Sequence, residues 1–259
     1  MTKTDIPYKG AFDGTRLNAQ PIQKLRKNDT GETLSVHSVF YTVQGEGPFS
    51  GQAAVFVRLA GCNLQCPMCD TEYTDGVQTR NMKEILRDIQ RHAPPQWRGL
   101  VVVSGGEPFR QNLSGLLRAL VSWGYYVQVE SNGTLPPPTL ATGYNTDTGQ
   151  KRGVYIVCSP KTGKVHDDIR HRACCFKYVL SADAVSDEDG LPTSVLGLPN
   201  PPARPSMGRD GKWIQPVYVQ PADHQDPEVN EANARATTRS GMRYGYTIQL
   251  QIHKYLNMK

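Results

Sequence analysis

The alternation of short apolar runs with stretches of helical periodicity constrains the fold of this chain more than any other feature. Residues 53–60 and 100–103 are short, mainly apolar runs of the kind found in buried strands. Between them, residues 82–89 place four apolar side chains at the spacing of one helix face. Parallel strands need a long crossover, which a helix usually provides. The alternation therefore predicts a parallel sheet in an α/β protein.

The same pattern continues along the chain and predicts about six β/α units, fewer than the eight of a closed barrel. We therefore expect an open partial (β/α)6-type barrel. A closing strand is expected where Tyr246, Ile248, Leu250 and Ile252 alternate with polar residues. The predicted strands are residues 34–43, 53–60, 100–103, 125–129, 154–157, 175–180, 217–219 and 246–252, and the predicted helices are residues 82–89, 113–121 and 227–242.

Two segments fall outside this periodic pattern. Residues 1–33 are polar and broken by Gly, Pro and Asn, so we expect an extended or partly ordered N-terminal arm before a domain at 34–259. Residues 185–212 hold five prolines and no apolar period, which predicts an insertion or mobile loop that contributes little to the core. Residues 135–153 form a second, shorter segment of this kind.

Composition and charge exclude several classes of protein. The 38% hydrophobic residues are ordinary for a globular chain, and the net charge of +5 is too mild to indicate nucleic acid as a partner. No apolar stretch approaches the roughly 20 residues of a membrane helix, and the first thirty residues lack a signal core. Six cysteines are too few for a disulfide scaffold of this size. We expect a cytoplasmic protein without a membrane partner.

Three of the cysteines, Cys62, Cys66 and Cys69, form a C-x3-C-x2-C cluster just after a predicted strand. Thiolates this close on one loop are ligands for an iron–sulfur cluster or for zinc. A zinc site needs a fourth ligand, and a 4Fe–4S cluster on three cysteines leaves one iron open to a small molecule. The candidates for a fourth zinc ligand lie at no customary spacing: His37, His92, Cys158 and Cys174. The spacing favours the cluster, and Cys158, Cys174 and Cys175 are expected to be buried as small hydrophobic residues.

The motifs around the cysteine cluster resemble those of a known enzyme superfamily. The cysteine motif and the segment 105–108, Gly-Gly-Glu-Pro, each follow a strand, as in the radical S-adenosylmethionine (SAM) superfamily. The segments 44–47 (Gln-Gly-Glu-Gly), 69–71 (Cys-Asp-Thr), 159–161 (Ser-Pro-Lys) and 250–256 resemble the 7-carboxy-7-deazaguanine synthase family more specifically. The resemblance covers residues 36–180 and 214–256.

That resemblance implies a radical SAM lyase that contracts 6-carboxy-5,6,7,8-tetrahydropterin to 7-carboxy-7-deazaguanine, with loss of ammonia, in queuosine and 7-deazapurine biosynthesis. The implied cofactors are a 4Fe–4S cluster, SAM and Mg²⁺. The implied partners are the pterin, a reductase such as flavodoxin and a second copy in a homodimer. One alternative is another small radical SAM enzyme, such as a glycyl-radical activase. The other is a non-enzymatic zinc-binding or RNA-binding module.

The resemblance also assigns roles residue by residue. Cys62, Cys66 and Cys69 would hold the cluster, and Thr71 would contact Mg²⁺. Arg58 would pair with the substrate carboxylate, where the alternative is a salt bridge at the end of its strand. The other expected substrate contacts are Val43, Gln44, Gly45 and Ser104. At the position of Ser104 the family commonly has threonine. The expected SAM contacts are Met68, Asp70, Gly106, Glu107, Glu130, Ser131, Ser159, Pro160, Lys161, Gln220, Pro221, Ala222 and Asp223.

The resemblance is weaker at two places. Residue 68 packs on the adenine of SAM and is often aromatic in the superfamily, but here it is Met68. Family members often end near a proline, and some use that terminus at the substrate. This chain ends in Asn257-Met258-Lys259, so the resemblance leaves open whether the terminus contacts the substrate.

Overall fold

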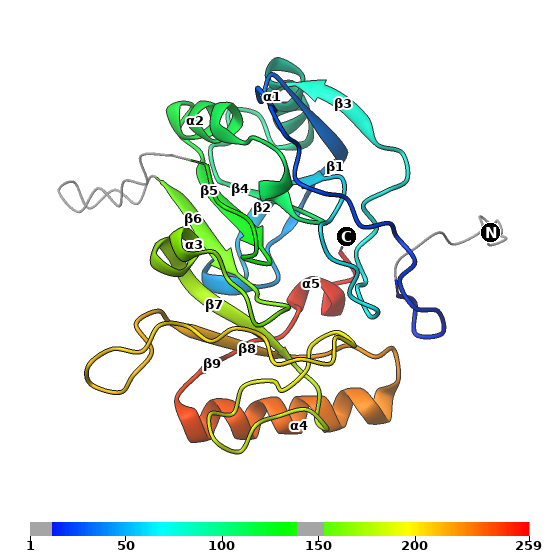
Figure 1. Ribbon diagram of the computed structural model, residues 1–259. Helices are drawn as coiled ribbons and strands as arrows, with labels where there is room; N and C mark the ends of the chain where they lie inside the picture. The colour runs from blue at the N-terminus through cyan, green and yellow to red at the C-terminus, as the bar shows by residue number, and fades with distance from the viewer. Residues whose placement is uncertain (1–11, 139–152, 259) are drawn as a thin grey trace, which may run out of the picture.

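The computed structural model describes residues 12–138 and 153–258. Within them, nine strands form one sheet in the order β3-β1-β2-β4-β5-β6-β7-β8-β9 (Figure 1). From β2 onward all neighbours run parallel, whereas β1 is antiparallel to β2 and β3. This topology confirms the open partial barrel. The strands are β1 (Thr33–Val43), β2 (Ala53–Leu59), β3 (Gln78–Asn81), β4 (Leu100–Gly105), β5 (Tyr126–Ser131), β6 (Val154–Cys158), β7 (Ala173–Leu180), β8 (Val217–Pro221) and β9 (Thr247–Ile248).

The helices in these residues cover the outside of the curved sheet, except for α5, which lies on its inner side (Figure 1). None of them is long and apolar enough to cross a lipid bilayer. Two short 3-10 helices, η1 (Gly47–Phe49) and η2 (Pro108–Arg110), follow β1 and β4. The α-helices are α1 (Met82–His92), α2 (Ser114–Ser122), α3 (Asp167–Arg172), α4 (Pro227–Tyr244) and α5 (Ile252–Tyr255).

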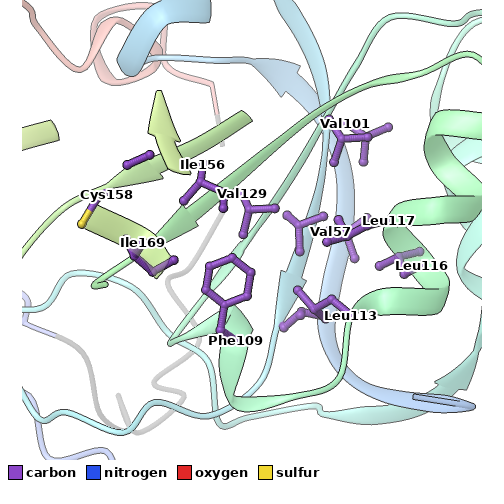
Figure 2. Close-up of a cluster of buried hydrophobic side chains, with 14 of the residues drawn as sticks. Val57, Val101, Phe109, Leu113, Leu116, Leu117, Val129, Ile156, Cys158 and Ile169 are labelled. Atoms are coloured by element: carbon purple, nitrogen blue, oxygen red, sulfur yellow. The ribbon is translucent and has the colours of Figure 1, made fainter. Parts of the chain in front are cut away.

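The main apolar core lies between the sheet and the outer helices. Figure 2 shows Val57, Val101 and Val129, from three neighbouring strands, beside Phe109 of η2 and Leu117 of α2. All five are buried. Successive side chains of a strand point to opposite faces of the sheet, so every second residue of these strands contributes to the core. Burial of this apolar area is the main favourable contribution to folding.

The remaining residues of the same strands point to the inner face. Arg58, Ser104, Glu130, Lys177 and Gln220 each follow directly after a core residue of their own strand, and all five line one cavity. Arg58 and Ser104 are neighbours in the register of β2 and β4. The period of two therefore separates the main core from a polar face near the carboxyl ends of the strands, while Ala54, Leu100 and Val102 form a second, smaller apolar cluster.

The two longest helices, α1 and α4, begin where the sequence supplies a cap. Asn81 accepts a hydrogen bond from the Glu84 amide at 3.0 Å, and Glu84 accepts one from the Asn81 amide at 2.8 Å. This reciprocal capping box fixes the start of α1. Asp226 caps α4 in a similar way by accepting from the Glu228 amide at 2.9 Å. The predicted weak helix at 227–242 is confirmed and continues to Tyr244.

The prediction of a closing strand over residues 246–252 is wrong beyond Ile248. Only Thr247–Ile248 pair with the sheet, and α5 begins at Ile252. The alternating amides of this segment bond to the loop after β1: Gln249 Nε2 donates to the Gly47 carbonyl at 2.7 Å, and Gln251 Nε2 to Glu46 at 2.6 Å. These bonds draw the chain inward. The short elements β3 and α3 were not predicted because neither carries an apolar period.

The expectation that residues 185–212 contribute little to the core is also wrong. Leu191 and Ala203 belong to the main apolar cluster, and Val195 is 2% exposed. Tyr178 Oη donates to the Ala203 carbonyl at 2.6 Å. An irregular segment buries single residues without any period, which is why periodicity could not reveal this packing. Of the second predicted loop, residues 139–152 lie outside the described residues, as do residues 1–11 of the arm.

Leu191 provides a test of this packing. We expect Leu191→Ala to lower the free energy of unfolding by about 2–5 kcal/mol, because it leaves a cavity in a fully buried site. The exposed Asn200 of the same segment is the matched control, and Asn200→Ala should change stability by less than about 0.5 kcal/mol. Urea unfolding measures both, and equal stability of the two variants would contradict the assignment of this segment to the core.

Candidate active site

A cavity of about 440 Å³ opens at the carboxyl ends of the parallel strands. It is lined by the cysteine loop, by inward-facing strand residues and by the end of the chain. Most of the predicted site residues meet there: Val43, Gln44, Arg58, Cys62, Cys66, Met68, Cys69, Asp70, Thr71, Ser104, Gly106, Glu130, Ser131, Ser159, Lys161, Gln220 and Asp223. Five predicted residues are not among those that line the cavity: Gly45, Glu107, Pro160, Pro221 and Ala222.

Cys62, Cys66 and Cys69 all present free thiols to this cavity. Burial raises the pKa of Cys62 and of Cys69 to about 12, and it raises the pKa of Cys66 as well. Thiolates are the usual ligands of iron–sulfur clusters, so the donor set fits a cluster with three protein ligands. Among the described residues, no three His, Cys, Asp or Glu side chains lie close enough together to hold a single metal ion.

The N-terminal arm holds the cysteine loop in place. The Phe12 amide donates to the Cys69 carbonyl, and the Gln23 amide to the Cys62 carbonyl, each at 2.7 Å. Asn18 Nδ2 donates to the Cys66 carbonyl at 3.0 Å. Residues 12–23 of the arm thus donate hydrogen bonds to the backbone carbonyls of all three cysteines. This contact could not be predicted from the sequence, because an irregular arm carries no period.

The Gly-Gly-Glu segment after β4 brings backbone close to the cysteine loop. Gly105 has a φ of +137°, and a Cβ atom there would overlap Leu59. A Cβ atom on Gly106 would lie 2.8 Å from Cys62 Cβ and would overlap the Gly61 carbonyl. Only glycine permits this approach, so the space beside the cysteines depends on both positions.

Glu107 turns its carboxylate away from the cavity and into the protein. It accepts from Ser131 Oγ at 2.9 Å and from the amides of Asn132 at 2.7 Å and Phe109 at 3.0 Å. Burial raises its pKa to about 7, against the opposing effect of these hydrogen bonds. Glu107 therefore joins the end of β4 to the end of β5, and its carboxylate does not face a ligand in the cavity.

Glu130 accepts hydrogen bonds from three polar side chains of the inner face. Its Oε1 accepts from Gln44 Nε2 and from Gln128 Nε2, both at 3.0 Å, and its Oε2 accepts from Ser104 Oγ at 3.1 Å. Gln44 Oε1 in turn accepts from the Glu46 amide at 3.1 Å. The loop after β1 is thereby fixed against β4 and β5.

Like Lys161, Arg58 is a cation of the cavity without a counterion among the described residues. It forms no ion pair with the described residues, and its Nε has no hydrogen-bond partner. Its guanidinium lies over the Phe40 ring, 5.2 Å from the ring centre. Burial lowers its pKa, although Asp70 and Glu130 act in the opposite direction. The alternative expectation of a salt bridge at the end of the strand is therefore wrong.

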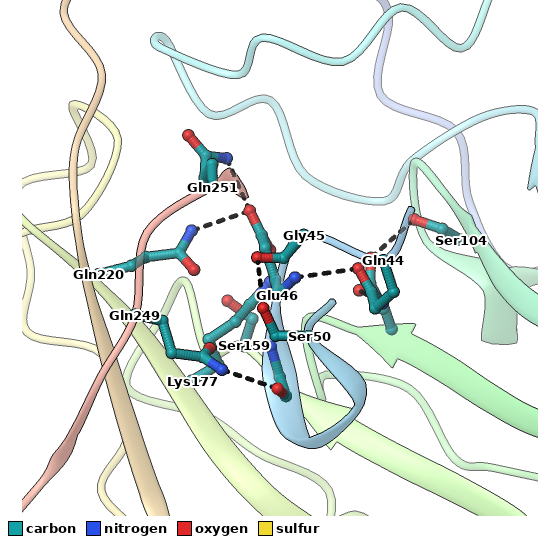
Figure 3. Close-up of polar contacts among 12 residues, drawn as sticks. Gln44, Gly45, Glu46, Ser50, Ser104, Ser159, Lys177, Gln220, Gln249 and Gln251 are labelled. Carbon is teal, nitrogen blue, oxygen red and sulfur yellow. Dashed lines mark hydrogen bonds and ion pairs between the residues drawn. The ribbon is translucent and has the colours of Figure 1, made fainter. Parts of the chain in front are cut away.

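A second buried cation, Lys177, is fully engaged and was not among the predicted site residues (Figure 3). It forms an ion pair with Glu46, which also accepts from Gln220 Nε2 at 3.0 Å and from Gln251 Nε2 at 2.6 Å. Burial alone would raise the pKa of Glu46, but Lys177 and the donated bonds hold it at about 2. Burial alone would lower the pKa of Lys177, but Glu46 and Glu130 raise it. A lysine within an apolar strand run was the signal available in the sequence.

The end of the chain closes one side of the cavity. Lys254 Nζ lies 3.1 Å from Asp70 of the cysteine loop and 2.7 Å from Asp223 after β8. The His253 ring packs so closely on Gly45 that any Cβ atom there would overlap it. Gly45 is thus required by packing, and Met258 lines the cavity at the position where the sequence departs from the family pattern.

The other cysteines lie apart from the cysteine loop. Cys158 is fully buried in the apolar core (Figure 2), and Cys175 is 1% exposed. Both therefore behave as small hydrophobic residues, as predicted. Cys174 is only half-buried, with its sulfur 4.0 Å from that of Cys175.

Comparison with known proteins agrees with this geometry. The model of the radical SAM superfamily matches residues 57–142. A 7-carboxy-7-deazaguanine synthase from Rhodospirillum rubrum is 40% identical over 233 residues, which are 88% of this chain and 94% of the relative. The enzyme of that name from Rickettsia prowazekii is 32% identical over 92% of this chain and 94% of the relative. The crystal structure of QueE from Escherichia coli has a TM-score of 0.59 at 19% identity, over 84% of this chain and 93% of that one.

We expect Lys177→Met to lower the free energy of unfolding by about 3–5 kcal/mol, because it leaves the Glu46 carboxylate buried without its partner. The double variant Glu46→Gln/Lys177→Met should recover most of that loss, since no buried charge then remains. Urea unfolding near neutral pH measures both. A single variant as stable as the wild type would show that the pair is not buried as described.

The same pair predicts a pH dependence. The Glu46 pKa falls from an ordinary 4.5 to about 2 on folding, so its stabilising effect is present above pH 4.5 and is lost as the pH falls toward 2. Between pH 6 and pH 3, the wild type should therefore lose more stability than the double variant. Parallel losses in the two proteins would mean that Glu46 does not titrate as stated.

Proposed function

The chain belongs to the 7-carboxy-7-deazaguanine synthase family of radical SAM enzymes, and we propose that it contracts the ring of 6-carboxy-5,6,7,8-tetrahydropterin to form 7-carboxy-7-deazaguanine. Ammonia is lost, and the product enters queuosine and other 7-deazapurine biosynthesis. One observation carries the proposal: the guanidinium of Arg58 has no counterion among the described residues and a buried Nε without a hydrogen-bond partner, and it shares a cavity with three cysteine thiols. An anionic substrate bound beside an iron–sulfur cluster would supply the missing counterion of Arg58. Membership of the family selects this reaction over the glycyl-radical activase and the zinc or RNA module.

Cys62, Cys66 and Cys69 are the residues that would hold the 4Fe–4S cluster. When bound, the cluster and SAM supply one-electron cleavage of the sulfonium S–C5′ bond, which begins radical chemistry. The protein's own part is to place the reactants and to exclude water. Cys62 and Cys66 are buried, Cys69 is half-buried, and Gly106 allows the backbone to approach them closely, so the chain provides a shaped cavity for this step.

The SAM site is proposed along the rim formed by the ends of β4 to β8. The backbone of Gly106 can approach the methionyl group, and Met68 lies on the side of the adenine. Lys161 Nζ donates to Ser159 Oγ at 2.6 Å, which fixes both side chains at the end of β6. The further proposed contacts that line the cavity are Asp70, Glu130, Ser131, Gln220 and Asp223. Four residues that do not line the cavity are proposed to support its rim by packing behind the lining residues: Glu107, Pro160, Pro221 and Ala222.

The substrate side is proposed at the loop after β1. Gln44 and Ser104, both bonded to Glu130, present amide and hydroxyl groups to the hydrogen-bonding edge of a pterin, with Val43 beside them. The planar guanidinium of Arg58 can donate two parallel hydrogen bonds to the substrate carboxylate. Thr71 lines the same cavity next to Asp70 and is the proposed contact of Mg²⁺, which commonly keeps substrate oxygens and water as its other ligands.

Assembly and the electron source are further parts of the proposal. A reductase such as flavodoxin would deliver the electron, and the free cysteines suit a reducing cytoplasm. A homodimer is proposed, with Leu17 and Ile22 of the arm, 65% and 59% exposed, available to its interface. Because the arm bonds to the cysteine loop, we treat it and the domain at 34–259 as one catalytic unit.

Cys66→Ala tests the cluster. We expect loss of the brown colour, of bound iron and of all SAM cleavage after anaerobic reconstitution, because the cluster then lacks one of its three protein anchors. Cys175→Ala is the matched control, a buried cysteine outside the cavity, and should retain its cluster. Full SAM cleavage by Cys66→Ala would exclude the assignment.

Arg58→Ala separates the named reaction from generic radical SAM chemistry. Removing the cation should raise the KM for the carboxypterin by roughly one to three decades, at about 1.4 kcal/mol per decade. Arg58→Lys should recover only part of this loss, because an ammonium cannot form the two-pronged contact.

The control is the cluster itself. Its absorbance and the slow, substrate-independent cleavage of SAM should persist in Arg58→Ala, since Arg58 does not hold iron. An unchanged KM with normal turnover in that variant would remove Arg58 from the substrate site.

A further inference from the structure

A tight turn at residues 195–198 reaches the cysteine loop from the Pro-rich segment. Leu196 and Gly197 have φ angles of +50° and +79°, and the Leu198 amide donates to the Val195 carbonyl at 3.0 Å. A two-residue turn with both central φ angles positive normally takes Asn, Asp or Gly at these positions. Leu196 is thus an unfavourable residue for its own backbone conformation.

Leu196 is exceptional in this respect among the described residues. Their other non-glycine residues with positive φ are Asn28, Gln96, Gln225 and Asn257, all with amide side chains. Asn in particular tolerates the left-handed region. An apolar side chain held there is unfavourable for folding, and such strain tends to occur at functional sites.

The turn places Leu196 directly beside the proposed adenine position. The Met68 amide donates to the Leu196 carbonyl at 3.0 Å, and Gly197 lies against Pro67. Leu196 is half-buried and lines the same cavity as Met68 and the three cysteines. Val195, 2% exposed, anchors the turn in the protein. The Pro-rich segment therefore contributes a residue to the active-site wall.

We propose that Leu196 is a SAM-binding residue whose side chain, together with Met68, forms the apolar wall against the adenine ring; this inference rests on the proposed function. Met68 is flexible and narrower than the aromatic residue often found at that position, so a second apolar group is needed to enclose a flat ring. Leu196 provides it from a different segment of the chain. The contact it gains with the cofactor offsets the unfavourable turn conformation.

Two substitutions separate the side chain from the backbone. Leu196→Gly and Leu196→Asn both suit a positive φ and keep the backbone bond to Met68, while they remove the apolar side chain. The matched control is Gln225→Gly, a change at another positive-φ position that does not line the cavity. The proteins are reconstituted anaerobically, and the iron content, the thermal midpoint and the Kd for SAM by equilibrium dialysis are measured.

We expect the Kd for SAM to rise roughly five- to thirty-fold in both Leu196 variants, as for partial loss of a buried leucine contact. The iron content should be unchanged, and the thermal midpoint should be unchanged or higher, since the strain is relieved. Gln225→Gly should bind SAM as the wild type does.

Wild-type SAM affinity in both Leu196 variants would overturn the inference. Loss of iron from both would also overturn it, because Leu196 would then support the cysteine loop and not the cofactor. If the reconstituted wild type itself binds no SAM, it is the proposed function that fails, so the two failures are distinguishable.

Discussion

The two-residue period of the parallel strands is the constraint on which the rest of the structure depends. The central strands send one set of side chains into the apolar core and, near their carboxyl ends, the other set into the cavity. The core fixes the strands, and the strands then fix the directions in which Arg58, Ser104 and Glu130 point. Because a shift of one residue would exchange the two sets, the burial of the valines specifies the register and the site together.

The buried ion pair of Glu46 and Lys177 connects the irregular parts of the chain to the sheet. Glu46 lies in the loop after β1, Lys177 in β7, and the amides of Gln220 and Gln251 reach the same carboxylate from β8 and from the end of the chain. A buried charge needs all of its partners, so these segments hold one arrangement relative to one another. Lys177 is thereby occupied by Glu46, whereas Arg58 forms no ion pair among the described residues.

The cysteine loop has no regular structure of its own and is held from outside. The arm bonds to its backbone on one side, the Pro-rich segment bonds to Met68 on another, and Lys254 pairs with Asp70. Segments that the sequence marks as irregular therefore hold the cysteine loop in place and line the cavity beside it.

The sequence by itself determined the alternation of strands and helices and the cysteine motif, because these follow from local periodicity and from spacing along the chain. Many of the residues that line the cavity were predicted from the family resemblance of the sequence motifs. The sequence could not show the packing of Leu191, the contacts of the arm or the partner of Lys177. It also predicted a strand where Gln249 and Gln251 turn inward. Each of these depends on which groups meet across long sequence separations, and burial and hydrogen bonding between distant segments are decided only when the chain has folded.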